Sequence, residues 1–243
     1  MQNPLQQSSF HLAHVRQLPP HRRAVVAGAT GLVGANILQQ LLDDPSVAEV
    51  HALCRRELDV RSPKLTVHLV DFRSIPALPP VDEAYLALGT TIRQAGSRRA
   101  FRAVDFEANL AVAQASLAAG ARRFGVVSAI SANARSKVFY NRVKGELEDA
   151  IAALGPEALV VVRPSFLLGD RKALKQPARY GEKIGIWVSQ LLRPLLPADF
   201  RPVEAHRVAR ALVLAVPTIG GKAIVPSGSI ADFELNSLYV PKR

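Results

Sequence analysis

Two hydrophobic patterns alternate along this chain. Short runs of consecutive apolar residues, often β-branched, are typical of strands buried on both faces of a sheet. They occupy residues 24–27, 50–54, 65–70, 84–88, 124–127, 159–164 and 223–226. Between several of these runs, apolar residues recur at helical spacing, in 35–42, 101–119, 140–154 and 203–215. The alternation predicts an α/β fold with a doubly wound parallel sheet.

The first run leads straight into a glycine-rich turn. Residues 24–34 read Ala-Val-Val-Ala-Gly-Ala-Thr-Gly-Leu-Val-Gly. Gly28 would permit a tight turn, Gly31 a close approach of the backbone to a pyrophosphate, and Gly34 close packing of helix on strand. Free N–H groups at the helix start would face the phosphates, with Thr30, Leu32 and Val33 completing the contact. The spacing is G-x-x-G-x-x-G, and a turn that binds nothing remains the alternative.

Two arginines follow the second strand. Arg55 and Arg56 come 21 and 22 residues after Gly34, where a site for NAD usually has an acidic residue on the ribose hydroxyl. A guanidinium instead offers a planar fork of donors to a phosphate. The sequence therefore predicts NADP(H) over NAD(H). Arginines that merely solvate the end of a strand are the alternative.

Further cofactor contacts are expected where other strands end. An Asp after the third strand could accept a hydrogen bond from an adenine amino group, or be an ordinary turn residue. A glycine after the fourth strand leaves room for a ribose, and the end of the sixth strand is a place for a nicotinamide. The residues concerned are Asp71, Phe72, Leu88, Gly89, Thr90, Pro164 and Ser165.

The fifth strand delivers Ser128, and the helix that follows carries Tyr140 and Lys144. The tyrosine and lysine stand at i and i+4, so both project from one side of the helix. A Tyr-x-x-x-Lys pair is a weak signal alone, but it gains weight from its place after the fifth strand, with a serine 12 residues upstream. Residues 91–100 are expected to form an exposed loop near this site.

Composition narrows the class of protein. The 243 residues, 49% of them hydrophobic, suffice for one globular domain, and no apolar stretch is long enough to span a bilayer. The formal charge of +11 is scattered, without basic runs interleaved with aromatics, so no nucleic-acid partner is expected. One cysteine, Cys54, suits a reducing cytosol and neither a disulfide framework nor a metal cluster. We therefore expect a cytoplasmic protein without a bound metal.

The ends of the chain complete the predicted organisation. Residues 1–21 read as a flexible tail without the apolar core of a secretory signal, and residues 22–243 as a single domain. No acidic residue precedes Asp43, which leaves an organelle transit peptide open, although such a peptide would need more Arg and Ser. Residues 165–202 are expected to form a small substrate-covering region. Within it, 184–196 with Trp187 could be an amphipathic pocket cover, a dimer contact or a membrane-surface face.

The glycine turn, Ser128, Tyr140-x-x-x-Lys144 and Arg163-Pro164-Ser165 occur in the order found in the extended and atypical short-chain dehydrogenases/reductases. The chain resembles that family over roughly residues 22–215. Residues 138–148 and the segment Gly89-Thr90-Thr91 look like its Tat-interacting-protein-like branch, near the NAD-dependent epimerases and dehydratases. The resemblance implies a Rossmann fold that binds NAD(P), with Ser128, Tyr140 and Lys144 as the catalytic residues.

These roles agree with the chemistry of carbonyl reduction. Free tyrosine, with a pKa near 10, holds its proton too tightly to act as a base near neutrality. A lysine ammonium one turn away and an oxidised nicotinamide would lower that pKa, so Tyr140 would serve as acid in reduction and base in oxidation. Lys144 would also hold a ribose hydroxyl of the cofactor, and Ser128 would bond the substrate oxygen.

Several alternatives remain at the level of sequence. Ala129 and Ile130 stand where extended members often have a hydroxyl, so Ser131 could replace Ser128 in that role. The favoured function is reduction or oxidation of a small carbonyl or alcohol. An NADPH-sensing regulatory protein without turnover and an epimerase or dehydratase are the alternatives. A homodimer through the helices at 101–119 and 140–154 is possible, and no residue pattern identifies the substrate.

Overall fold

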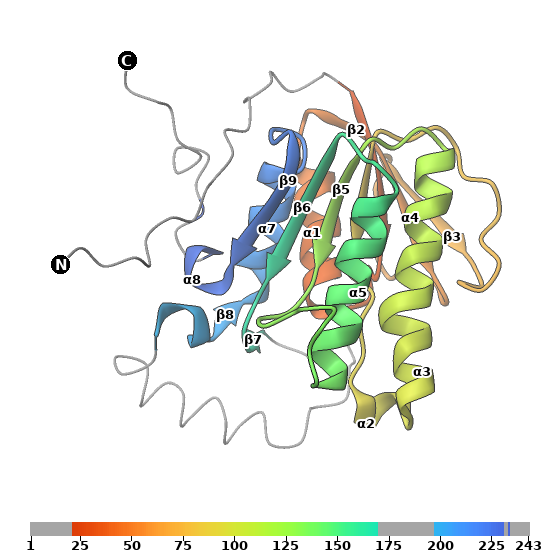
Figure 1. The fold of residues 1–243 in the computed structure, drawn as a ribbon. Coiled ribbons are helices and arrows are strands. Elements are labelled where there is room, and N and C mark those ends of the chain that lie inside the picture. The colour runs from red at the N-terminus through yellow and green to blue at the C-terminus, as the bar shows by residue number, and fades with distance from the viewer. Residues whose placement is uncertain (1–20, 170–196, 231–232, 234–243) are drawn as a thin grey trace, which may run out of the picture.

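We describe the protein from a computed structural model that covers residues 21–169, 197–230 and 233 (Figure 1). Seven strands form one sheet in the order β3-β2-β1-β4-β5-β6-β9, and every neighbouring pair is parallel. The strands are β1 (Arg22–Ala27), β2 (Val47–Cys54), β3 (Leu65–Leu69), β4 (Glu83–Leu86), β5 (Arg123–Val127), β6 (Ala158–Arg163) and β9 (Gly221–Pro226). This order and direction confirm the prediction of a doubly wound, Rossmann-type parallel sheet.

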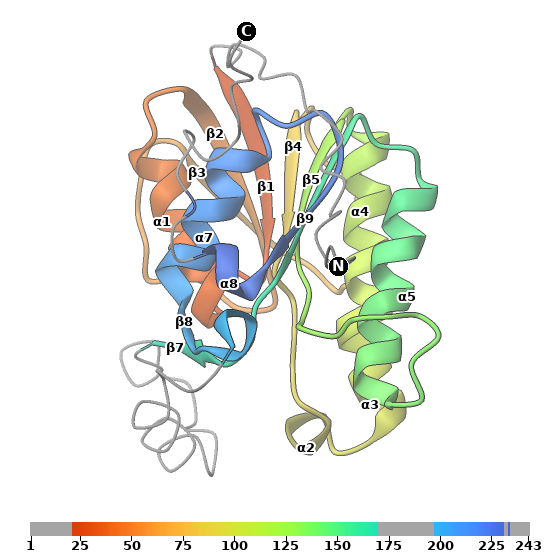
Figure 2. The same ribbon diagram turned by 60° about the vertical axis from the view of Figure 1, so that its left-hand side comes forward.

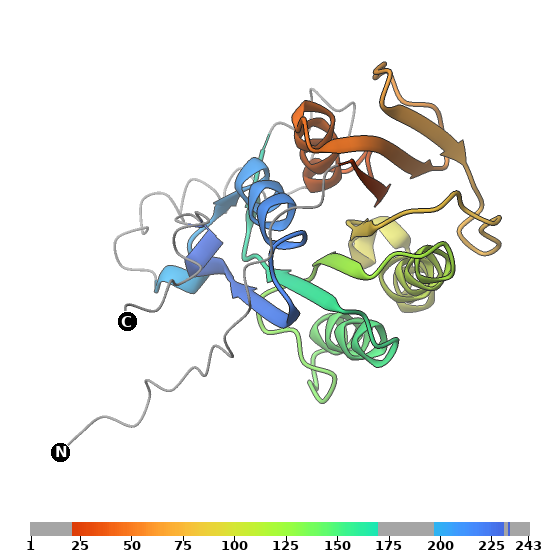
Figure 3. The same ribbon diagram turned by 90° about the horizontal axis from the view of Figure 1, so that it is seen from above.

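Helices cover both faces of the sheet. Seen from above, the green helices lie on one side and the orange and blue helices on the other (Figure 3). The first layer contains α4 (Asn109–Ala118) and α5 (Phe139–Ala153), and the second contains α1 (Leu32–Asp43) and α7 (Ala205–Ala215). The view in Figure 2 shows the same two layers with the sheet between them. Two hydrophobic cores result, one on each face.

The central strand β1 shows why its sequence is apolar without alternation. Ala24 and Val26 belong to the core beneath α1 and α7, whereas Val25 and Ala27 belong to the core beneath α4 and α5. All four residues are fully buried. A strand covered on both faces needs apolar side chains at every position, as the run at 24–27 has.

The region expected as an exposed loop, 91–100, is partly helical, so that expectation is wrong. It contains α2 (Ile92–Ala95) and the start of α3 (Arg98–Arg102). Thr91 and Ser97 cap these helices, since each hydroxyl accepts a backbone N–H three residues along. The helix predicted at 101–119 therefore begins earlier, and a π-helical stretch, η1 (Ala103–Ala108), joins α3 to α4.

Part of the predicted substrate-covering region is described. It contains β7 (Leu167–Leu168), η2 (Ala198–Phe200) and β8 (Val203–Glu204). The short helix α8 (Ser227–Ile230) lies outside this region and directly follows β9. The segment expected to be an amphipathic cover, 184–196, and most of the predicted tail at 1–21 lie outside the described residues. Among the described ranges, no helix has both the length and the apolar character that crossing a membrane requires.

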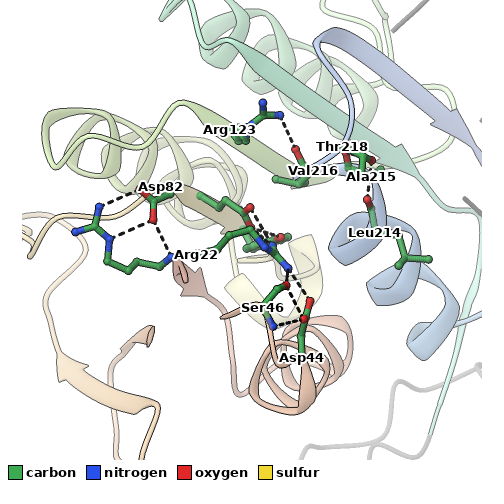
Figure 4. Close-up of polar contacts among 12 residues, drawn as sticks. Arg22, Asp44, Ser46, Asp82, Arg123, Leu214, Ala215, Val216 and Thr218 are labelled. Carbon is green, nitrogen blue, oxygen red and sulfur yellow. Dashed lines mark hydrogen bonds and ion pairs between the residues drawn. The ribbon is translucent and has the colours of Figure 1, made fainter. Parts of the chain in front are cut away.

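A buried polar network joins the amino ends of β1 and β4 (Figure 4). The Arg22 guanidinium donates to both carboxylate oxygens of Glu83 at 2.9 and 2.8 Å, and to Asp44 at 2.6 Å. Tyr85 donates its hydroxyl to Glu83 at 2.8 Å. Because parallel strands share one direction, this network lies at the edge of the sheet opposite the carboxyl ends of the strands. The helix α2 and the start of α5 lie near the carboxyl ends (Figure 1).

Candidate functional site

The glycine turn lies between β1 and α1, and its geometry explains all three glycines. Gly28 has a φ of 91°, and a Cβ there would lie 2.5 Å from the Ala87 carbonyl oxygen. A Cβ on Gly34 would lie 2.0 Å from the Gly28 carbonyl oxygen, and one on Gly31 would lie 3.0 Å from it. The turn therefore brings α1 against the end of β1 more closely than any side chain would allow.

The start of α1 is suited to an anion. Gly31 is the N-cap residue, no side chain caps the helix, and its first turn contains no acidic residue. The N–H groups of an uncapped first turn lack helical partners, and the helix dipole makes this end positive. Thr30 is half-buried beside this turn, while Leu32 and Val33 are buried. Gly169, at the end of β7, packs against Leu32, where a Cβ would lie 2.6 Å from Cδ1.

The ends of β2 and β3 present charged groups. Arg55 and Arg56 are exposed directly after β2, and Arg56 is close enough to Cys54 to influence its pKa. Asp71 is engaged locally: Arg73 donates to its two carboxylate oxygens and its backbone N–H also donates. Asp71 thus has the bonding of a turn residue, the alternative left open by the sequence. Phe72 packs against the core beneath α4 and α5.

Lys144 is buried beneath the loop that follows β4. Its Nζ lies 2.7 Å from Asp105 Oδ1, and the two side chains are 5% and 1% exposed. Asp105 Oδ2 accepts the backbone N–H of Thr90 at 2.8 Å. A Cβ on Gly89 would lie 3.6 Å from Asp105 Oδ1 and 3.9 Å from Lys144 Nζ, so the glycine covers the ion pair closely. Burial lowers the pKa of Lys144, but the charge and hydrogen bond of Asp105, together with Tyr140 and Glu148, outweigh the effect of burial, and the net shift is upward.

Tyr140 is half-buried one helical turn before Lys144. Its ring packs against the fully buried ring of Phe101 in α3, with centroids 5.5 Å apart. The structure therefore brings Lys144 close to Gly89 and Thr90 at the carboxyl edge of the sheet, with Tyr140 one helical turn before Lys144 on α5.

Ser128, which follows β5, belongs to a second polar cluster. This cluster is centred on Glu148, one helical turn after Lys144 on α5. The Ser128 hydroxyl donates to Glu148, which is 1% exposed. Arg163, at the end of β6, donates to the two oxygens of Glu148 at 3.0 and 2.5 Å. Ser131 is exposed and has a φ of 64°, which is uncommon for a residue other than glycine. The hydroxyl of Ser128 thus points to Glu148, and which serine would meet a substrate stays a prediction.

Two further features border this second cluster. A polar cavity of about 400 Å³ is lined by residues 132–135 and by Gly145, Glu148, Asp149 and Arg163. Pro164 is buried, and Ser165 is held on both sides: its N–H donates to the Ser227 hydroxyl and its own hydroxyl donates to the Arg201 carbonyl. Ser165 is therefore fixed in position beyond the end of β6.

Sequence reasoning missed Asp105, Asn109 and Glu148. Asn109 is buried, and its amide donates to the carbonyl of Leu88 at 3.1 Å, which fixes the end of β4. Glu148 continues the four-residue spacing of Tyr140 and Lys144, and Asp105 interrupts an otherwise apolar helix face. Those two irregularities were the available signals, but neither identifies a partner on another helix.

No protein-family model matches the chain. Solved structures resemble it in fold. One is UDP-N-acetylglucosamine 4-epimerase from Methanobrevibacter ruminantium, with a TM-score of 0.64 and 16% identity, covering 85% of this chain and 77% of that one. Another is the Bordetella bronchiseptica enzyme WbmG in complex with NAD, with a TM-score of 0.58 and 16% identity, covering 87% and 76%. These likenesses agree with the Rossmann-type α/β fold that the resemblance implied.

Relatives by sequence are closer. The mitochondrial protein FMP52 of Eremothecium gossypii is 34% identical over 200 residues, which are 79% of this chain and 88% of the relative. That of Candida albicans is 32% identical over 189 residues, 72% and 82% of the two chains. These relatives are named mitochondrial, which overturns the expectation of a cytoplasmic protein: one buried cysteine indicates only a reducing compartment. The chain belongs to the FMP52 family.

Proposed function

We propose that this protein is an NADP(H)-dependent oxidoreductase that interconverts a small carbonyl compound and its alcohol, with Tyr140 as the acid and base. The observation that carries the proposal is the position of Lys144 against Gly89 and Thr90, at the sheet edge where the glycine turn also lies, with Tyr140 one turn before it on α5. A phosphate-binding turn and a tyrosine–lysine pair at one edge of the sheet suit a nicotinamide nucleotide and a reacting oxygen.

The residues present fit a dinucleotide. The cradle formed by Gly28, Gly31 and Gly34 has no room for side chains, and the first turn of α1 offers N–H groups to a pyrophosphate. Arg55 and Arg56 are exposed at the end of β2, where a 2′-phosphate would lie. The nicotinamide, when bound, supplies the hydride transfer.

The chain's own groups would manage the proton. Tyr140 would give its hydroxyl proton to a substrate oxygen in reduction and take it back in oxidation. Lys144, charged and buried, would hold a ribose hydroxyl with a donor that Asp105 does not occupy. Ser128 or Ser131 would bond the substrate oxygen. Exposed Phe166, just beyond β6, would offer an apolar contact to the substrate.

An epimerase or dehydratase is the second candidate. It is favoured by the fold likeness to sugar-nucleotide epimerases, one of them holding UDP-N-acetylmuramic acid. Such enzymes regenerate their nucleotide within one catalytic cycle, so the purified protein would carry bound nucleotide. A reductase would instead release its nucleotide at each turnover.

The test is a titration of nucleotide-free protein with NADPH and NADH, read by thermal shift or by tryptophan fluorescence. We expect tighter binding of NADPH. Arg55→Ala and Arg56→Ala should each weaken NADPH binding about 10- to 100-fold and leave NADH binding nearly unchanged, because a charged hydrogen bond to the extra phosphate is lost. Arg61→Ala, which removes an exposed arginine on the same connection, is the control.

Turnover is then sought on a panel of carbonyl compounds with wild type and Tyr140→Phe. Loss of turnover with retained NADPH binding supports the assigned role of Tyr140. Binding without turnover of any carbonyl by the wild type would favour an NADPH-sensing protein. Preference for NADH would contradict the role of the arginines, and binding of neither nucleotide would contradict the proposal as a whole.

We also propose a mitochondrial location, by analogy with the FMP52 relatives. The absence of acidic residues before Asp43 agrees with it. Fractionation of source cells should recover the protein with mitochondria, and recovery in the cytosol alone would contradict this.

A further inference from the structure

Asp105 is a buried acid that the proposed mechanism does not use as a proton donor or acceptor. It lies in the π-helical stretch η1, and π-helical turns often occur at functional sites. Its two oxygens serve different partners: Oδ1 lies 2.7 Å from Lys144 Nζ, and Oδ2 accepts the Thr90 N–H at 2.8 Å. Asp105 therefore links the loop after β4 to the lysine of α5.

The pairing is part of a matched register between two helices. Phe101 and Asp105 are four residues apart, as are Tyr140 and Lys144. The Phe101 ring packs on Tyr140, and the Asp105 carboxylate pairs with Lys144. The segment 101–105 thus supports both members of the tyrosine–lysine pair.

We infer that Asp105 is a positioning residue for the proposed redox site, because its buried carboxylate holds Lys144 as an ammonium against the loop Gly89–Thr90 that would face the cofactor ribose. This inference rests on the proposed function and adds to it a residue outside the predicted set. A lysine that is 5% exposed in its side chain would otherwise lose its charge readily, since burial disfavours the charged form.

Three titratable groups bear on the charge of Lys144. Asp105 faces it from η1, and Tyr140 and Glu148 flank it one turn away on α5. Glu148 is already paired with Arg163 and bonded to Ser128. The Gly89–Thr90 loop contributes a backbone N–H but no charged group. Of these three groups, Asp105 is the one that forms the ion pair with Lys144.

The test compares wild type with Asp105→Asn, which keeps an oxygen for the Thr90 N–H but removes the charge. Exposed Glu107→Gln, two residues along the same helical stretch, is the control. NADPH binding is measured from pH 6 to pH 10. We expect wild type and the control to bind NADPH with the same affinity as each other at each pH from 6 to 9. Asp105→Asn should lose at least tenfold in affinity as pH rises, because Lys144 then sheds its proton within that range.

A second readout needs no nucleotide. The free energy of unfolding is measured over the same pH range. Without its counterion, buried Lys144 has a folded-state pKa below its unfolded value, so Asp105→Asn should be destabilised at pH 7 and should regain stability as pH rises toward about 10.4. Lys144→Met in the Asp105→Asn background should restore stability at pH 7. If Asp105→Asn alone does not fold, this double variant supplies the comparison, and its failure to fold as well would contradict the inference.

The two proposals fail differently. If wild type does not bind NADPH or NADH, the proposed function fails, and the unfolding measurements still decide the pairing. If wild type binds nucleotide and Asp105→Asn matches it at every pH in both readouts, the positioning role is overturned while the proposed function stands.

Discussion

At the scale of single residues, the ion pairs of Asp82 and Glu83 differ sharply in burial, although the two residues are adjacent at the start of β4. Glu83 pairs with Arg22 where both side chains are essentially buried. Asp82 pairs with Arg23 where the side chains are 40% and 37% exposed. Burial raises the pKa of Glu83 even against the charge of Arg22, whereas hydrogen bonds from Arg23 lower the pKa of Asp82.

We predict that Glu83→Gln destabilises the protein by on the order of 3 kcal/mol, because it leaves the buried Arg22 charge with only Asp44 as counterion. Asp82→Asn, the same chemical change one residue away, should cost about 0–1 kcal/mol. Urea unfolding of both variants measures the difference. Equal effects would show that burial does not govern the strength of these pairs.

At the scale of elements, the turn between β1 and α1 has the strictest steric requirement. A Cβ on Gly34 would meet a backbone oxygen at 2.0 Å, and backbone cannot move aside as a side chain end can. Gly220, in contrast, has open space around its Cβ position and an ordinary φ. Replacing Gly34 therefore tests a steric requirement for glycine, whereas replacing Gly220 tests only the effect of glycine on backbone freedom.

We predict that Gly34→Ala costs about 1–3 kcal/mol or more in stability and abolishes nucleotide binding, because α1 must shift away from the turn. Gly220→Ala should be neutral or stabilise by about 0.4–1 kcal/mol, by restricting the unfolded chain. Thermal unfolding with and without NADPH measures both effects. Normal NADPH binding by Gly34→Ala would show that the turn is not the phosphate site.

A pair of histidines lies between β2 and the edge strand β3. His51 Nδ1 of β2 lies 3.1 Å from His68 Nε2 of β3, so the two rings are within hydrogen-bond distance of each other. Burial, and then the charge of His51, lower the pKa of His68. A histidine whose pKa is lower in the folded than in the unfolded protein contributes stability at pH values above its unfolded-state pKa. That contribution is lost as the pH falls through its folded-state pKa.

We therefore predict that stability declines as pH falls below about 6.5 and that His68→Gln flattens this decline. The free energy of unfolding between pH 5 and pH 8 is the measurement. His206→Gln removes an exposed histidine on α7 and should leave the slope unchanged. A slope that survives in His68→Gln would assign the pH dependence to other groups.

At the scale of the whole molecule, the sheet order brings sites together that are far apart in sequence. β1 and β4 are neighbours, so the glycine turn after β1 and the Gly89–Thr90 loop after β4 lie at one edge. β5 lies beside β4, and α5 returns across it with Tyr140 and Lys144. Residues from three separate βα units therefore meet at this edge of the sheet.

Local patterns determined much of this protein. Apolar runs, helical periodicity and the glycine spacing give the strands, the main helices and the β1–α1 turn, because each depends on neighbours within a few residues. The same holds for Tyr140 and Lys144 lying on one face of one helix. The helices at 91–100 escaped prediction because their stability comes from the small caps at Thr91 and Ser97 and from packing of Phe101.

Tertiary structure decided the partners of the charged groups. Nothing local indicates that Asp105 meets Lys144, that Ser128 points to Glu148, or that Arg22 meets Glu83 across 61 residues. Those pairings depend on which helices and strands become neighbours, and on burial, which makes an unpaired charge costly. The sequence by itself determined the elements and the candidate chemistry. Only the packing of those elements determined which groups hold the candidate residues in place and in which charge state.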